Sequence, residues 1–585
     1  MSFTHLHVAS GFSAHYGVNR PELLVEAAHN LGFDALALTD RDGLYGAIKH
    51  IGACLQVDMA PIVGVDLPVL DEDGSLLARV VVLAHGHNKG LGWATLCAVV
   101  SEAHAIGKKK LFGIKRSKLS QLVNTGLVSC TVLLGPDSDV AKATLGRSKN
   151  AALKALKQWL ELFDKPGALG IEIVSLLTEP GKLFSSIQAR RMLELADSLN
   201  VPAVLTNSVR YINPDDAITA DILDAARFLE PLGKFEPQPN AQAWLKPKAL
   251  MQQVALEITE DRKRARKLIA DTSLLADLCR LDPVSDCGWG KAKTPEKEAL
   301  GIEGNPFEVL FEKVQSGVNW RYGSVSGKQR TKIQHRLSQE LITINKLGFA
   351  TYFLTVADVA QMIRDMNIRI AARGSGAGSL VNYLLGISGV DPIEHDLLFE
   401  RFLSVERSSL PDIDIDVESA RRHDIYRAIF KRYGSKRVTL LSMQSTYRGR
   451  GAMRDSALAL GIDPDQVDDI ASSMWRFSAS SFRNALNVKP ELAEFAQAVE
   501  HDRKMNLLVD MTERLDRIPR HISMHPCGVI LGDLTLPLLT PVEPSGMGLP
   551  MSQFDKDDMD PMGLLKLDVL GVRMQSTMAY AVSEI

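Results

Sequence analysis

Short apolar runs alternate with amphipathic helical patterns over roughly the first 275 residues. The apolar runs at 35–38, 79–84 and 202–205 have the length of strands, and residues 21–31 have helical spacing. Strands that alternate with helices typically build an α/β domain around a parallel sheet. We therefore predict such a domain over residues 1–275, with a largely parallel sheet and with ligands at the carboxyl ends of its strands.

The pattern changes after this region. A stretch rich in Gly, Pro and Lys at 282–306 predicts a domain boundary. Helical spacing follows at 330–367, and strand-like alternation appears at 410–417 and again at 564–569, with a mostly helical segment at 443–517 between them. The chain is therefore expected to be multidomain, with an α/β part followed by an α+β part.

Composition limits the class of protein. The 585 residues exceed what one hydrophobic core usually supports, and 45% hydrophobic and 23% charged residues are ordinary for a soluble protein. No window approaches the roughly 20 apolar residues of a bilayer helix, and the N-terminus lacks a secretory signal. The six cysteines lack zinc-site spacing. We expect a cytoplasmic protein with no membrane partner, while the net charge of −3 does not decide whether it binds nucleic acid.

The segment 411–417 reads Pro-Asp-Ile-Asp-Ile-Asp-Val. In a strand, Asp412, Asp414 and Asp416 project from one face while the apolar residues pack on the other. Three neighbouring carboxylates repel one another unless cations compensate them, so the pattern predicts a divalent metal site. The alternative is a solvated acidic edge strand.

A second strand-like segment contains Lys566 and Asp568 on one face. Alone it would be a routine strand with charges facing solvent. Beside the triple-Asp strand, Asp568 would complete a two-metal site and Lys566 would supply a cation suited to phosphate.

The segment 370–379 passes from an apolar run through Arg373, Gly374 and Ser375 into a helix near Ser379. Unpaired backbone amides at a helix start can cradle phosphate. The segment matches neither the Walker A loop nor the dinucleotide fingerprint. A tight strand-to-helix turn explains it equally well.

Several motifs now stand in a recognisable order and spacing: 373–380, 396–403, Glu406-Arg407, 411–416, 553–555 and 566–571. Together they resemble the palm of the bacterial C-family DNA polymerases, which include the DNA polymerase III alpha subunit and the error-prone polymerases. The resemblance implies a polymerase-beta-like nucleotidyltransferase palm in two parts with a helical thumb inserted between them. The implied boundaries are palm 276–442, thumb 443–517, palm 518–575 and the start of the fingers at 576–585.

The resemblance also implies roles for single residues. The residues implied to be catalytic and to bind two Mg²⁺ ions are Asp414, Asp416 and Asp568. Those implied to bind the triphosphate of the dNTP substrate are Arg373, Gly374, Ser375, Arg401 and Lys566.

Basic residues in the thumb-like segment are expected to bind DNA. Arg448, Arg450 and Arg454 would grip the phosphates of primer-template DNA, although a solvated helix face explains them nearly as well. His521 and His525 would either contact nucleotide phosphate or be structural histidines.

The first domain resembles the polymerase and histidinol phosphatase (PHP) domain at 5–10, 38–43 and 61–66. This resemblance implies an α/β barrel-like fold with a metal site for phosphoester hydrolysis. The ligands that remain are His7, Asp40 and Asp66. Ala9, Arg41 and Arg210 stand where the family has histidines, and neither alanine nor arginine can bind a metal ion. We expect a degenerate site and a structural domain, with weak single-metal binding left open.

The function implied is DNA-directed DNA polymerisation in replication or in error-prone, translesion repair synthesis. One alternative is a truncated or split polymerase fragment without independent activity. Another is a PHP-type 3′→5′ exonuclease or phosphoesterase. The resemblance covers only part of a complete polymerase, so a separate chain could supply the fingers and C-terminal domains, and sliding-clamp contacts would lie in those regions.

Overall fold

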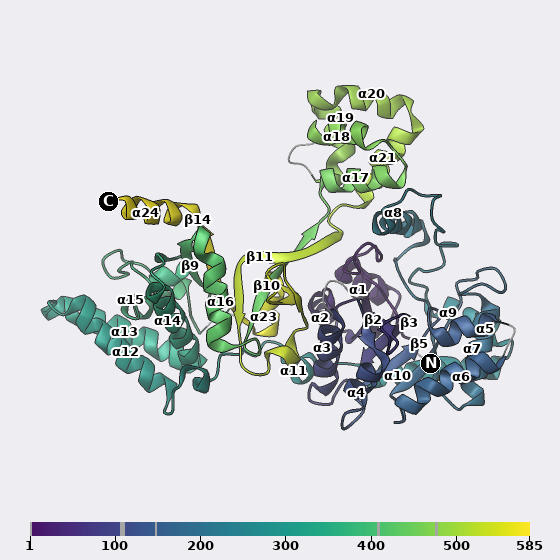
Figure 1. The fold of residues 1–585 in the computed structure, drawn as a ribbon, viewed down its shortest axis with the longest axis horizontal. Coiled ribbons are helices and arrows are strands. Elements are labelled where there is room, and N and C mark those ends of the chain that lie inside the picture. Colours follow the sequence, from purple (N-terminus) through teal and green to yellow (C-terminus); the bar gives the residue numbers. More distant parts are fainter. Residues whose placement is uncertain (1–2, 106–111, 147–148, 406–409, 474–477) are drawn as a thin grey trace. The chain divides into compact units, whose positions relative to one another are not determined.

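The fold is described from a computed structural model, for residues 3–105, 112–146, 149–405, 410–473 and 478–585 (Figure 1). The chain divides into two compact units. Unit 1 comprises Met1–Cys287 and Gln444–Ser523, and unit 2 comprises Gly288–Met443 and Met524–Ile585. No helix within the described ranges is long and apolar enough to cross a membrane.

Unit 1 contains a seven-stranded sheet in the order β1-β2-β3-β5-β6-β7, with β4 paired to β2. Its strands are β1 Ala35–Arg41, β2 Ala60–Leu70, β3 Leu76–Ala84, β4 Ile114–Lys115, β5 Cys130–Leu134, β6 Leu169–Val174 and β7 Ala203–Thr206. The sheet is largely parallel, as expected, but β3 runs antiparallel to both β2 and β5. The short turn between β2 and β3 forces this direction, since a parallel neighbour needs a long crossover.

The N-terminal segment links the two edges of this sheet. Its backbone oxygens at His5 and Val8 accept hydrogen bonds from β1, while Ala9 N–H donates to Val209 O just beyond β7. The mixed α/β content fits the expected fold class. The same segment brings the N-terminal histidines to the ends of the strands.

Helices surround the sheet of unit 1. They are α1 Pro21–Asn30, α2 Ala47–Gln56, α3 Leu91–His104, α4 Arg116–Asn124, α5 Asp139–Leu145, α6 Lys149–Leu162, α7 Ser186–Ser198, α8 Ala217–Phe228, α9 Lys248–Thr259, α10 Arg262–Cys279 and α11 Pro283–Asp286. Buried apolar side chains from the strands and from α10 form one continuous core.

Residues 443–517, which lie between the two Asp-bearing strands in the sequence, are mostly helical, as predicted. Its helices are α17 Gly449–Ala459, α18 Pro464–Ser473, α19 Phe482–Val488, α20 Ala493–His501 and α21 Arg503–Arg514. They enclose a core of their own, in which Phe482 stacks on Phe495. A second cluster, with Tyr447 and Ala452 beside Ile222 and Leu223, packs these helices on α8 within unit 1.

Unit 2 is built on a second seven-stranded sheet in the order β12-β13-β10-β11-β14-β9-β8. Its strands are β8 Ile370–Arg373, β9 Ile413–Glu418, β10 Val438–Thr446, β11 Pro519–Leu531, β12 Val542–Pro544, β13 Pro550–Asp555 and β14 Leu565–Val572. Its helices are α12 Pro306–Tyr322, α13 Gly327–Leu347, α14 Ala350–Asp365, α15 Leu380–Leu384, α16 Arg422–Tyr433, α22 Leu536–Leu539, α23 Met559–Met562 and α24 Arg573–Glu584.

Strands β9 and β14 confirm the predicted alternation. Ile413, Ile415 and Val417 are buried, and the Asp residues between them are partly exposed. Helices α14 and α16 contribute Tyr352 and Tyr426, whose hydroxyls donate to backbone oxygens of β14. The apolar faces of the strands are thereby anchored, which leaves the carboxylates on the opposite face.

Candidate metal centre and its surroundings

The two predicted acidic strands are neighbours. Strand β14 runs parallel to β9 with Asp568 directly opposite Asp414. Oxygen atoms of Asp412, Asp414 and Asp568 all lie within 4.8 Å of one another, and no other group of three His, Cys, Asp or Glu residues in the described ranges does so. The predicted convergence of two distant stretches of sequence is confirmed.

Lys566 bridges two of these carboxylates. Its Nζ donates to Asp412 Oδ2 at 2.6 Å and to Asp568 Oδ2 at 2.8 Å. The remaining oxygens, Asp412 Oδ1 and Asp568 Oδ1, are enclosed and have no hydrogen-bond partner among the described residues. Asp414 likewise forms no ion pair or hydrogen bond within the described part of the chain. The cluster therefore retains unsatisfied acceptors, which are costly when buried.

Electrostatics gives the same picture. Burial raises the pKa of Asp414 to about 6, and the charges of Asp412 and Asp568 add to this effect. Burial also raises the pKa of Asp412, although Lys566 opposes the shift. When all groups are ionised, three carboxylates and one ammonium leave a net charge of −2. That charge and an all-oxygen donor set suit a hard divalent cation such as Mg²⁺.

Asp416 has a different partner. It shares the exposed face of β9, but its Oδ1 accepts a 2.6 Å hydrogen bond from Arg373 Nε on β8. Of the three aspartates predicted to bind metal, Asp414 and Asp568 thus lie together, and Asp416 lies beside them in an ion pair. Asp412, which the strand alternation but not the family resemblance placed at the predicted metal site, completes the close group.

The glycine-rich turn passes next to this cluster. Gly374 adopts φ +68° and ψ −156°, which is strained for any residue with a side chain. A Cβ atom there would also lie 2.8 Å from Asp414 Oδ2. The backbone conformation therefore requires glycine, and the close approach shows that the turn at Gly374 lies against the Asp414 carboxylate.

The expectation of unpaired amides at the following helix start is wrong. Glu340 is completely buried, and its carboxylate accepts hydrogen bonds from Leu380 N, Val381 N and Ser379 Oγ. Arg336 pairs with the same carboxylate at 2.7 Å. The Glu340 carboxylate thus binds the amides that were expected to bind a phosphate. Glu340 lies 40 residues before Leu380, so no local sequence pattern reveals this contact.

Arg401 ends the short 3₁₀ helix η4, Phe399–Arg401, and its side chain is exposed. The preceding Leu398 carbonyl lies 2.9 Å from where a Cβ of Gly378 would be, so this turn packs on the glycine-rich turn. Glu406 and Arg407 lie outside the described residues.

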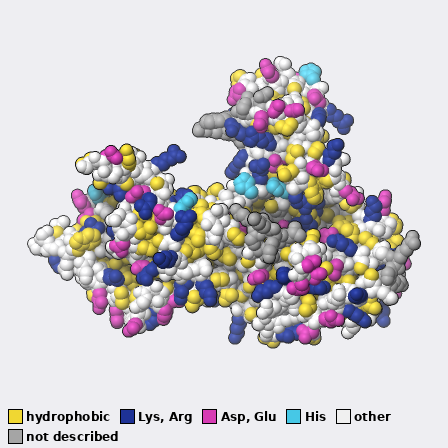
Figure 2. Space-filling view, viewed as in Figure 1, with side chains coloured by type: hydrophobic (Ala, Val, Ile, Leu, Met, Phe, Trp, Pro, Cys, Tyr) yellow, Lys and Arg dark blue, Asp and Glu magenta, His cyan; other side chains and the backbone are white. Residues whose placement is uncertain are grey.

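The three arginines predicted to bind DNA all belong to unit 1. Arg448 precedes α17, and Arg450 and Arg454 lie on it with exposed side chains. Arg454 pairs with Asp468 at 2.9 Å, and both side chains are more than half exposed. Lys and Arg side chains lie on the outer surface of helices α17–α21, among acidic side chains (Figure 2).

The two histidines of β11 differ. His521 is exposed, whereas His525 is partly buried and its Nδ1 accepts from Cys527 N at 3.3 Å. Burial lowers the pKa of His525 while the charge of Asp568 acts against it. His525 is therefore within the electrostatic reach of the carboxylate cluster.

The three residues predicted to remain from a metal site in unit 1, His7, Asp40 and Asp66, all have partners within the protein. His7 Nδ1 lies 2.7 Å from Glu172 Oε1, which also accepts from Thr206 Oγ1. Burial would lower the pKa of His7, but Glu172 outweighs it and the pKa is raised. Asp40 accepts from Ser10 and Ser13, and burial nevertheless raises its pKa to about 6.

Arginines neutralise the third retained ligand. Asp66 accepts from Arg41 Nε and from Arg79 Nε, each at 3.0 Å, and Arg79 also pairs with Asp42 at 2.8 Å. Burial would raise the pKa of Asp66, but Arg79 and Arg41 lower it. A guanidinium cannot lose its proton, so these charges are permanent.

A tyrosine holds two of the substituting arginines together. The guanidinium carbons of Arg41 and Arg210 lie 3.6 and 4.0 Å from the ring centroid of Tyr16. Arg210 also donates two hydrogen bonds to Asp224, at 3.0 and 3.1 Å, in a buried pair. Arg41 and Arg210 thus lie over the same ring, and sequence reasoning missed Tyr16, Glu172 and Asp224.

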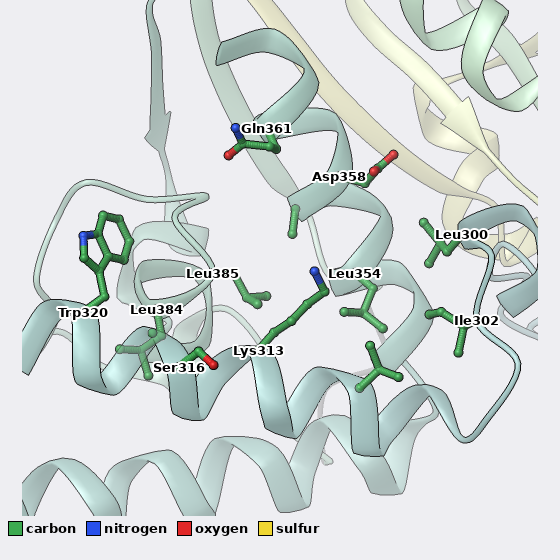
Figure 3. Close-up of a pocket in the computed structure, with 13 residues that line it drawn as sticks. Leu300, Ile302, Lys313, Ser316, Trp320, Leu354, Asp358, Gln361, Leu384 and Leu385 are labelled. Atoms are coloured by element: carbon green, nitrogen blue, oxygen red, sulfur yellow. The ribbon is translucent and has the colours of Figure 1, made fainter. Parts of the chain in front are cut away.

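A separate pocket of about 540 Å³ lies in unit 2 between α12, α14 and α15 (Figure 3). Trp320 stands on one side, and Lys313 extends across it below Gln361. Asp358 at its far side is bound by Arg432 and by the Tyr433 hydroxyl. None of the predicted site residues lines it.

Comparison with known proteins defines the class of chain. Residues 308–571 match the bacterial DNA polymerase III alpha NTPase domain, and residues 5–175 match the PHP domain. The protein thus joins a PHP domain to a polymerase core region.

Its relatives make this more specific. It is 30% identical to an error-prone DNA polymerase of Symbiobacterium thermophilum, over 100% of this chain and 52% of the relative. It is 31% identical to one of Pseudomonas aeruginosa, over 99% and 51%. The chain belongs to the bacterial DNA polymerase III alpha and error-prone polymerase family, and it spans about half the length of the curated relatives it matches. An amidohydrolase structure from Chromobacterium violaceum aligns over 36% of this chain and 88% of its own, with 13% identity and a TM-score of 0.26, which is too low to bear on the fold.

Proposed function

We propose that this chain carries the catalytic site of a DNA-directed DNA polymerase, which transfers a nucleotide from a dNTP to a primer 3′-hydroxyl. The process served would be replication or error-prone, translesion repair synthesis. The observation that carries the proposal is the pairing of Asp568 with Asp414 on adjacent strands beside the Gly374 turn. Unit 2 would be the palm, and α17–α21 the thumb.

Different residues of the site would bind the metal ions and the triphosphate. Asp414, Asp416 and Asp568 would hold two Mg²⁺ ions, which lower the pKa of the primer hydroxyl and neutralise charge on the triphosphate. Gly374 and Ser375 would approach the triphosphate through their backbone. Arg373, Arg401 and Lys566 would supply positive charge to it, since phosphate oxygens accept strong hydrogen bonds from cationic donors.

DNA would be held outside the metal centre. Arg448, Arg450 and Arg454 would bind phosphates of the primer-template. The Arg454–Asp468 ion pair is exposed and contributes little to stability, so Arg454 could exchange it for a phosphate contact.

The PHP domain is proposed to be structural. A hydrolytic centre needs ligands with free lone pairs, and here Asp66 is bound by two arginines and His7 by Glu172. This arrangement argues against the exonuclease or phosphoesterase alternative.

A primer-extension assay with Mg²⁺, with and without a candidate C-terminal partner chain, tests the proposal. We expect extension that is lost in Asp416→Ala while the variant remains folded by circular dichroism. Extension that survives replacement of Asp414, Asp416 and Asp568 together would refute the site. Metal-dependent nuclease activity abolished by His7→Ala would instead support the hydrolytic alternative.

A further inference from the structure

Two aspartates on the same face of β9 differ in what surrounds them. Asp414 has no ion-pair or hydrogen-bond partner in the described part of the chain, and it lies with Asp412 and Asp568. Asp416, two residues later, accepts a 2.6 Å hydrogen bond from Arg373. The same strand thus presents one carboxylate ready for a cation and another already bound by one.

Charge separates the two positions further. Asp412, Asp414 and Asp568 with Lys566 carry a net charge of −2, which one divalent ion neutralises. Asp416 and Arg373 together are neutral. Because a guanidinium stays protonated, a second divalent ion at Asp416 would face an undiminished positive charge unless Arg373 moved away.

Arg373 is placed so that it can move. Its side chain is 48% exposed, whereas that of Asp416 is 17% exposed. It immediately precedes Gly374, the residue whose backbone lies against Asp414. A triphosphate bound at this turn would offer the guanidinium several oxygens, and such pairs are commonly bidentate and strong.

We propose that Arg373 is a positioning residue, an inference that rests on the proposed function. Arg373 keeps Asp416 out of the metal centre until the Arg373 guanidinium binds a nucleotide triphosphate instead. Without nucleotide, the chain then holds a single divalent ion, on Asp412, Asp414 and Asp568. Release of Asp416 completes the second position only when the substrate is present.

Asp412 acquires a defined role in this scheme. Its Oδ2 holds Lys566, and its Oδ1 is enclosed without a hydrogen-bond partner in the described part of the chain, so it can face a cation. Lys566 binds only one oxygen of Asp412 and one of Asp568. The lysine therefore neutralises part of the cluster without occupying all its acceptors.

The test is to count the Mn²⁺ ions bound to the full chain without nucleotide, by electron paramagnetic resonance of free Mn²⁺. We expect one tightly bound ion in the wild type and two in Arg373→Gln, because Asp416 is then free. The double variant Arg373→Gln/Asp416→Asn should return to one, and Arg373→Lys should remain at one because the cation is kept. Arg432→Gln is the matched control, since Arg432 is 49% exposed, pairs with Asp358 in the same unit and should leave the count at one.

Outcomes separate this inference from the proposed function. Two ions in the wild type, both lost in Asp414→Asn, or a single ion in a folded Arg373→Gln, would overturn the role of Arg373 and leave the polymerase site standing. Mn²⁺ binding that is unchanged in both Asp414→Asn and Asp568→Asn would overturn the metal centre itself, and the proposed function with it. Thermal unfolding of each variant verifies that it is folded.

Discussion

The chain contains two acidic sites, and they differ in the cations that neutralise them. In unit 1, Asp66 is bound by two arginines, and Arg210 forms a buried ion pair with Asp224. In unit 2, Lys566 donates to both Asp412 and Asp568. Asp414 forms no ion pair with any described residue, and burial raises its pKa to about 6. The first site is saturated by the protein itself, and the second is left electrostatically unsatisfied.

This difference shows how one type of residue can serve stability or function. A carboxylate that is paired with an arginine stabilises the fold, because the guanidinium stays charged and its geometry matches that of the carboxylate. A carboxylate cluster short of positive charge stores unfavourable energy that an added cation can relieve.

The largest expected effect is on catalysis. Asp414→Asn and Asp568→Asn should each lower primer extension about 10³-fold, since the metal ions supply roughly 4 kcal/mol of transition-state stabilisation. Asp197→Asn, which alters an exposed pair with Arg264 in unit 1, is the control and should keep full activity. Full activity in both Asp414→Asn and Asp568→Asn, measured in steady-state extension assays, would show that the carboxylate cluster is not catalytic.

The next largest effect is on the free energy of unfolding, through the buried Arg210–Asp224 pair of unit 1. Arg210→Met should lower the free energy of unfolding by about 3 kcal/mol, because it leaves the buried Asp224 without its forked partner. Asp224 still pairs with Arg227, so the loss should lie near the lower end of the usual range. Urea denaturation measures the change. Arg264→Met, in a more exposed pair, should cost under about 1 kcal/mol, and equal losses in the two variants would contradict the structural role.

Metal ions should affect the two units unequally. At about 100 times its dissociation constant, Mg²⁺ should stabilise unit 2 by about 2.7 kcal/mol. Amide hydrogen exchange in β9 should slow by up to about 100-fold on addition of Mg²⁺ and recover with a chelator, while exchange in β1 should not change. Protection of β1 by the metal would mean that the PHP site still binds it.

The smallest effect is the pH dependence of the metal-free protein. The folded-state pKa of Asp414 is raised, so the unfolded chain loses this proton first, and stability falls as the pH rises from about 4 to about 6. Asp414→Asn removes this loss and should be more stable than wild type by about 1 kcal/mol above pH 6, after allowance for solvent screening at a half-exposed group. Thermal unfolding of both proteins at a series of pH values measures it. An equal difference at pH 4 and pH 7 would count against the charged cluster.

The sequence predicted local features of the site well. Alternation in 411–417 and 564–569 identified which side chains share a face, because the period of a strand is fixed by its geometry. The substitutions at Arg41 and Arg210 were likewise visible, since arginine cannot be a metal ligand. The register that pairs Asp568 with Asp414 could be expected only through the family resemblance.

Long-range partners were not predictable from the sequence. Glu340 occupies the helix start at Leu380, Lys566 pairs with Asp412, and Tyr16 stacks between Arg41 and Arg210. Each contact joins residues far apart in the chain, and no local pattern encodes the partner. The same is true of β3, whose direction follows from a short turn that apolar runs alone do not reveal.

Anomalous diffraction from crystals of the full chain soaked in Mn²⁺ tests the central claim most directly. The account predicts a strong peak among Asp412, Asp414 and Asp568 and none beside His7 and Asp66. A peak beside His7 and Asp66, or no peak among Asp412, Asp414 and Asp568 at a saturating concentration of Mn²⁺, would contradict it.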